Sequence, residues 1–219
     1  MEAVFGLTFY MPYLSEGTSH SAEHWASIDS YLARCFALGI RVNYALEHYC
    51  SGPTAAKPDG CTVAQRAQMI EEVRRVQNHK AIYSWYLADE PVAHKVPVDG
   101  LTAAVAAVRA VDSRPITMTL SLGANEFNTS TNASNIHRQL LTACDIVMSD
   151  TYPVGLNPRF YRDSNMSLDP GEHVASVGSL TRTLVDGVAF ISALHDGRHR
   201  HVIMVAQSFG SLGNVWDRK

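Results

Sequence analysis

Two adjacent carboxylic acids, Asp89 and Glu90, follow the apolar residues of the segment AIYSWYLADEP, whose last residue is Pro91. Acids at the carboxyl end of a parallel strand lie at the edge of the sheet where α/β enzymes build their active sites. Two neighbouring carboxylates at the end of a buried strand repel each other, so the pKa of one should rise and let it donate a proton near neutral pH. Glu90 is therefore our first catalytic candidate. The alternative is a helix start, with an acid as the N-cap and Pro91 in the first helical position.

A second carboxylate is available at the ends of two other apolar segments. Asp150 closes the segment IVMSD and is our best partner for Glu90, although it could instead accept hydrogen bonds from backbone groups or pair with an arginine. Glu47, at the end of NYALEHY, is a weaker partner that could bind a ligand hydroxyl or lie in a solvated loop. Further polar or aromatic residues near strand ends offer ring faces or hydrogen-bonding groups to a ligand: Tyr10, Tyr86, Tyr152 and Gln207.

Strand and helix patterns alternate strictly along the chain. Apolar, β-rich segments are predicted at Val4–Tyr13, Ile40–Leu46, Ile82–Ala88, Pro115–Leu120, Ile146–Tyr152 and Val202–Phe209. Helical periodicity occupies Ala22–Leu38, Val63–Asn78, Leu101–Val111, Asn135–Ala143 and Val177–Leu194. This alternation predicts an α/β fold with a parallel sheet covered by helices, and residues 1–219 are interpreted as one domain.

Two α/β architectures fit the alternation, a doubly wound open sheet and a (β/α)8 barrel. The segment MPYLSEGT after the first strand contains no GxGxxG or GxxxxGK pattern, which removes the main support for a nucleotide-binding sheet. Functional groups at most strand ends favour the barrel. Because six strands are evident, the barrel is expected to be incomplete, and Pro153–Gly171 is interpreted as a loop that walls a cleft.

The segment SWYLADEP resembles the fourth-strand signature of clan A glycoside hydrolases, (β/α)8 barrels in which that strand ends in an acidic residue followed by proline. CDIVMSDTYPVG and HVIMVAQSFG look like the sixth and seventh strands of glycosidase-like barrels. The resemblance implies that Val4 begins at about the second strand. The first and eighth strands would then lie outside this chain.

The resemblance implies hydrolysis of O-glycosidic bonds, with Glu90 matching the general acid/base. Asp89 stands where many members have an asparagine that contacts the sugar 2-hydroxyl, and Gln207 stands where the nucleophilic glutamate is expected. An amide cannot act as a carboxylate nucleophile. Two hypotheses follow: a glycoside hydrolase that uses Glu90 and Asp150, or a noncatalytic carbohydrate-binding barrel. In either case the sugar would contact Asp89, Tyr10, Glu47, Tyr86, Tyr152 and Gln207.

Composition narrows the choice of partners. The chain has 219 residues, 46% of them hydrophobic, and a formal net charge of -3, which gives no electrostatic reason to expect nucleic acid or an anionic membrane. The longest apolar runs are far shorter than the roughly 20 residues that span a bilayer. The ten histidines form neither an HxH pair at a first strand nor an HExxH motif, so we expect no metal and no cofactor.

The cysteines and the glycosylation sequons bear on localisation. Cys50 and Cys61 flank a loop rich in glycine, proline and lysine, and they either close it with a disulfide or stay reduced. Cys35 and Cys144 are predicted to be buried thiols. Sequons at Asn128, Asn132 and Asn165, together with the loop cysteines, favour an extracellular, secreted protein, and the absence of a signal peptide then implies a mature or incomplete chain.

Overall fold

The computed structural model describes residues 9–12, 21–50, 61–92, 96–120, 139–150 and 201–205, and of 149–150 and 201–205 it describes the backbone. Contacts between Cα atoms divide the chain into two compact units. The first comprises Met1–Met118 and Ala143–Ile146, and the second comprises Thr119–Thr142 and Val147–Lys219. The interpretation of residues 1–219 as one domain stays a prediction.

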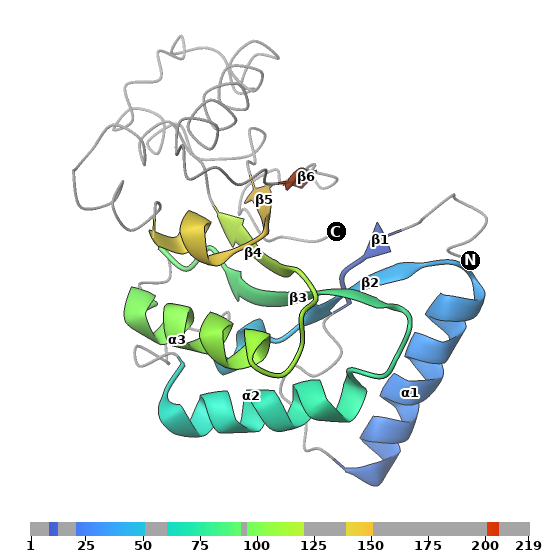
Figure 1. The fold of residues 1–219 in the computed structure, drawn as a ribbon. Helices are drawn as coiled ribbons and strands as arrows, with labels where there is room; N and C mark the ends of the chain where they lie inside the picture. The colour runs from blue at the N-terminus through green and yellow to red at the C-terminus, as the bar shows by residue number, and fades with distance from the viewer. Residues whose placement is uncertain are drawn as a thin grey trace, which may run out of the picture. The chain divides into compact units, whose positions relative to one another are not determined.

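The described strands are β1 (Phe9–Tyr10), β2 (Arg41–Ala45), β3 (Ile82–Asp89), β4 (Ile116–Leu120), β5 (Ile146–Asp150) and β6 (His201–Val205). They are hydrogen-bonded in chain order in one sheet (Figure 1). β1 pairs with β2 in parallel, and β2 pairs with β3 in parallel. Strand order that follows chain order, with helices in the connections, defines an α/β fold of the incomplete (β/α)8-barrel type. The predicted fold class is confirmed.

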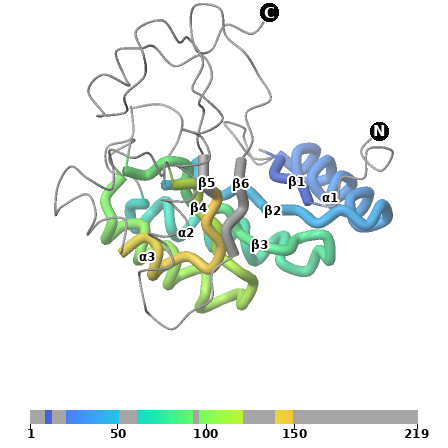
Figure 2. The backbone as a smooth tube through the Cα atoms, turned by 90° about the horizontal axis from the view of Figure 1, so that it is seen from above, coloured from blue at the N-terminus to red at the C-terminus, as the bar shows by residue number. Residues whose placement is uncertain are grey.

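Three helices connect the first strands: α1 (Ala22–Ala37), α2 (Val63–Val76) and α3 (Val98–Arg109). Helix α1 begins where the Ser21 hydroxyl accepts a hydrogen bond from the backbone of His24, and it ends before Gly39, whose φ of 74° suits a residue without a side chain. Helix α2 begins with a capping box between Thr62 and Gln65. Figure 1 shows these helices together on one side of the strands that they connect, and Figure 2 shows the same elements from above.

The two faces of β2 and β3 have different chemistry. On the helix side, Tyr44 and Trp85 are fully buried, and their rings make an edge contact at 5.7 Å between centroids. The opposite face carries Asn43 and Ser84, which are register partners and are also fully buried. A β-bulge between Val42 and Asn43 shifts the pairing of the two strands. From Asn43 onward, side chains of paired residues on β2 and β3 point to the same face of the sheet.

The observed elements follow the predicted ones closely. The observed bounds lie close to the predicted ones for β2, β3, β4, α1 and α2. Helix α3 differs more, because it begins at Val98, three residues earlier than predicted. The predicted strand Val4–Tyr13 is described only at residues 9–12, of which Phe9–Tyr10 is β-strand. The predicted helix Asn135–Ala143 is described as helical at residues 139–143. The predicted helix Val177–Leu194 and the loop Pro153–Gly171 lie outside the described residues.

Candidate active site

Strand β3 delivers the two acids at its carboxyl end. Tyr86 is fully buried, and its hydroxyl donates a hydrogen bond to Oδ1 of Asp89 at 2.9 Å. Asp89, the last residue of the strand, is half-buried, as is Glu90 after it. The tyrosine predicted to stack on a ligand is therefore a buried partner of the neighbouring acid.

Glu90 has an unusual backbone conformation. Its φ is 38°, in the left-handed region that residues with a side chain seldom adopt. The next residue, Pro91, is buried, and its carbonyl accepts a hydrogen bond from the backbone of Val96 at 2.8 Å. Strained backbone of this kind occurs mainly where the surroundings hold a residue in place, and it gathers at functional sites.

The alternative role of the acids as a helix cap is wrong. Helix α3 begins at Val98, and Pro97 is its N-cap, without a side-chain hydrogen bond. Asp89 and Glu90 therefore belong to the strand end and to the turn that follows it. The proline after them lies seven residues before the helix begins.

Glu47 lies just after the end of β2, which is hydrogen-bonded to the end of β3. The backbone of Leu46 donates to the carbonyl of Tyr86 at 2.7 Å, which fixes the end of β2 against β3. Glu47 follows as the first residue of the short 3-10 helix η2 (Glu47–Tyr49), and only 2% of its surface is exposed. The prediction that Glu47 could lie in a solvated loop is wrong, because the residue is buried.

A buried carboxylate on α2, Glu72, was not among the candidate residues. It accepts hydrogen bonds from the hydroxyls of Tyr44 at 2.8 Å and Tyr49 at 2.6 Å, and Nε2 of His48 lies 3.9 Å away. Burial and the adjacent Glu72 carboxylate raise the pKa of Tyr49 well above its ordinary value, so this hydroxyl stays protonated. The signal in the sequence was an acid on the apolar side of a helix, between Met69, Val73 and Val76.

A polar layer lies beneath Tyr86 on the same face of the sheet. Oδ1 of Asn43 accepts hydrogen bonds from the hydroxyls of Ser84 at 2.8 Å and Thr117 at 2.7 Å, so one amide joins β2, β3 and β4. The sulfur of Met11 lies 3.6 Å from Nδ2 of Asn43. All three polar side chains are fully buried. Barrel interiors are usually filled by bulky branched residues, and this level is polar instead.

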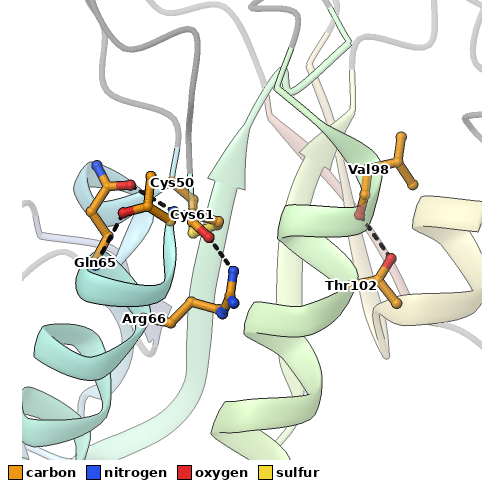
Figure 3. The surroundings of a disulfide bond; sticks show 7 residues. Cys50, Cys61, Gln65, Arg66, Val98 and Thr102 are labelled. Carbon is orange, nitrogen blue, oxygen red and sulfur yellow. Dashed lines mark hydrogen bonds between the residues drawn. A yellow bond between two sulfur atoms is a disulfide. The ribbon is translucent and has the colours of Figure 1, made fainter.

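A disulfide joins Cys50 to Cys61, so the first of the two alternatives for these cysteines is correct (Figure 3). It connects the end of η2 to the start of α2, where the Arg66 guanidinium donates to the carbonyl of Cys61. The bond thus closes the connection that follows Glu47. Cys35 and Cys144 are buried, as predicted.

The remaining predicted site residues are placed only in part. Tyr10 ends β1 and is 39% exposed. The backbone of Asp150 ends β5 in the second unit, and its side chain lies outside the described residues. Tyr152, Gln207 and the three sequon asparagines also lie outside the described residues.

The described part of the chain holds neither a cluster of metal ligands nor a membrane-spanning helix. Within it, no group of three or more histidine, cysteine, aspartate or glutamate residues could hold a metal ion. Over the same residues, no helix has the length and apolar character needed to cross a membrane.

No family model matches the sequence, and no curated protein matches it. Solved structures with a similar fold include glycoside hydrolases at low identity. A GH2 beta-galacturonidase from Eisenbergiella tayi is 14% identical over 80% of this chain and 26% of its own, with a TM-score of 0.48. A beta-glucosidase from Exiguobacterium marinum is 12% identical over 94% of this chain and 76% of its own, with a TM-score of 0.46.

A third similar structure is an endo-beta-N-acetylglucosaminidase from Cordyceps militaris, 13% identical over 90% of this chain and 70% of its own, with a TM-score of 0.40. This chain spans about a quarter of the length of the beta-galacturonidase. Similarities this distant assign neither an activity nor a residue role to the chain.

Proposed function

We propose that the protein is a glycoside hydrolase that cleaves O-glycosidic bonds with Glu90 as its general acid/base. The observation that carries this proposal is the position of Glu90, half-buried directly after β3 and held at a φ of 38° beside a second acid. A carboxyl group fixed at the carboxyl end of a parallel strand can protonate a leaving oxygen in a cleft. The incomplete (β/α)8-barrel fold is compatible with this chemistry.

The reaction needs a second carboxylate, and Asp150 is the proposed one. In retaining enzymes the two carboxyl groups lie ~5 Å apart, and in inverting enzymes roughly 6.5–9.5 Å apart. Asp150 is the last residue of β5, just as Asp89, the residue before Glu90, is the last residue of β3. Glu47, at the end of β2, is proposed to bind the sugar together with Asp89, Tyr10, Tyr152 and Gln207, whereas Tyr86 is fully buried and contacts Asp89 instead.

The decisive experiment compares leaving groups. A general acid matters most when the leaving group is a poor one, because a good leaving group departs without a proton. Glu90→Gln should lower hydrolysis of phenyl glycosides by about 10²–10⁴-fold and that of dinitrophenyl glycosides much less. The matched control is Glu71→Gln, the same substitution at an exposed glutamate of α2. Equal losses on both substrates would refute the acid role, and no hydrolysis by the natural protein would refute the enzyme.

The second candidate is a noncatalytic carbohydrate-binding protein. Gln207, at the position where the resemblance places the nucleophile, favours it because an amide cannot form a glycosyl ester. This candidate predicts saturable binding of a sugar, measured by calorimetry, with no product released. Turnover that disappears in Asp150→Asn would contradict it.

We further propose that the protein works in an oxidising, extracellular compartment. The Cys50–Cys61 disulfide supports this proposal, because such bonds persist mainly outside the cytosol. Mass spectrometry of alkylated protein from the native source should find these two cysteines unmodified until a reductant is added. Alkylation of both without reductant would contradict it.

A further inference from the structure

We infer that Tyr86 is a positioning residue, which fixes Asp89 and the end of β2 at the candidate active site. This inference rests on the proposed function and assigns a role to a side chain that does not itself reach the sugar. Tyr86 is fully buried, so its ring is fixed by packing, and its hydroxyl donates to Oδ1 of Asp89 at 2.9 Å. The ring therefore holds one oxygen of the acid in a defined direction.

The backbone of Tyr86 makes a second connection to the site. Its carbonyl accepts the hydrogen bond from Leu46 at 2.7 Å, and its register partner on β2 is Ala45. Glu47 follows these two residues directly. A single residue of β3 thus connects the turn that carries Asp89 and Glu90 with the strand end that carries Glu47.

The role of Tyr86 matters because Asp89, which it contacts, is the residue before Glu90. The backbone of Glu90 is in the left-handed region. A side chain that anchors the preceding residue restricts how this strained turn can relax. Displacing a catalytic group by about 1 Å can cost about 10²-fold in rate. Loss of the Tyr86 hydroxyl should therefore lower turnover, although the hydroxyl itself takes no part in the reaction.

A neighbouring tyrosine supplies a matched control. Tyr44 lies on the adjacent strand, is also fully buried, and also donates to a carboxylate, Glu72, at 2.8 Å. Its acceptor belongs to α2, on the helix side of the sheet, whereas the acceptor of Tyr86 lies at the end of β3. Tyr86→Phe and Tyr44→Phe each remove one buried hydroxyl, so a general loss of stability should be similar in the two variants.

The test is a double-mutant cycle on kcat and KM for aryl glycosides. Tyr86→Phe should lower kcat by about tenfold or more while KM changes less, and Tyr44→Phe should change neither. If Tyr86 acts through Asp89, Tyr86→Phe combined with Asp89→Ala should be no slower than Asp89→Ala alone, because alanine leaves the Tyr86 hydroxyl without its acceptor. A tyrosine with only a structural role would give multiplying losses.

Each outcome bears on a separate claim. Multiplying losses, or equal effects of Tyr86→Phe and Tyr44→Phe, would overturn the positioning role while leaving the hydrolase intact. If the natural protein binds sugar without turnover, the same cycle is run on the dissociation constant, where non-multiplying losses support the role and multiplying ones overturn it. A protein that neither cleaves nor binds a sugar would overturn both the proposed function and the role of Tyr86.

Discussion

Glycine at position 90 should stabilise the protein relative to alanine, because the backbone there has a φ of 38°. The left-handed conformation costs an ordinary L-residue about 1–2 kcal/mol, and glycine adopts it without this cost. Glycine also has a more flexible unfolded chain, which opposes the gain by about 0.4–1 kcal/mol. Glu90→Gly should therefore be more stable than Glu90→Ala by roughly 0.5–1 kcal/mol.

The comparison isolates the backbone, since both variants lack the glutamate side chain and both should lose the same catalytic activity. Urea unfolding followed by tryptophan fluorescence measures the difference, with the buried Trp85 as a probe. In a chain of this length, 1 kcal/mol corresponds to a shift in Tm of about 2–4 °C. The expected advantage of glycine is thus about 1–4 °C.

Ala88→Gly is the control, because Ala88 lies inside β3 and its φ is not positive. Glycine should lower stability there by about 0.5–1 kcal/mol. The expected sign therefore reverses between positions 88 and 90. If Glu90→Ala proves at least as stable as Glu90→Gly, the backbone of this residue is not strained and the structural argument for a functional turn fails.

Three further predictions concern stability. Glu72→Ala should destabilise the fold by about 3 kcal/mol in urea unfolding, because two buried tyrosine hydroxyls lose their acceptor. The hydrogen bond from Arg75 holds the pKa of Asp29 below 3.8, so Asp29 stabilises the fold above that pH and this contribution fades as the pH falls through the lowered pKa. The stability of Asp29→Asn should hence approach that of the natural protein in acid. Reducing the Cys50–Cys61 bond, which closes 11 residues, should cost roughly 3 kcal/mol.

Each of these predictions has its own control. Glu71→Ala changes the neighbouring exposed glutamate and should stay within about 0.5 kcal/mol of the natural protein, so equal losses at 71 and 72 would count against the buried carboxylate. A gap between Asp29→Asn and the natural protein that widens in acid would contradict the sign of the pKa shift. For the disulfide, the Cys50→Ala, Cys61→Ala double variant should respond to urea identically with and without reductant.

The positions of helices and strands were predictable where local chemistry repeats along the chain. Helix α1 follows a serine cap and buries Ile28, Leu32 and Cys35 on one side, and α2 follows a threonine–glutamine capping box. β3 is a run of apolar and aromatic residues long enough to cross the sheet. These features depend on residues near one another in sequence, so the sequence alone could predict them.

Other features depend on contacts between distant residues. The left-handed backbone of Glu90 was not predicted, because glutamate has no preference for that region and the surrounding turn imposes it. Tyr86 was predicted to face a ligand, and its hydrogen bond to Asp89 depends on how the strand ends. Glu72 was missed because its partners, Tyr44 and Tyr49, lie 28 and 23 residues away.

The amide of Asn43 has an evolutionary consequence. Since its oxygen accepts from both Ser84 and Thr117, an apolar residue at position 43 alone would remove the acceptor of the buried Ser84 hydroxyl and leave Thr117 only the longer hydrogen bond to the carbonyl of Trp85. Replacing all three together by apolar residues of similar volume could be nearly neutral. Among relatives of this protein, positions 43, 84 and 117 should therefore change as a set, and natural variants with only one of them altered should be rare.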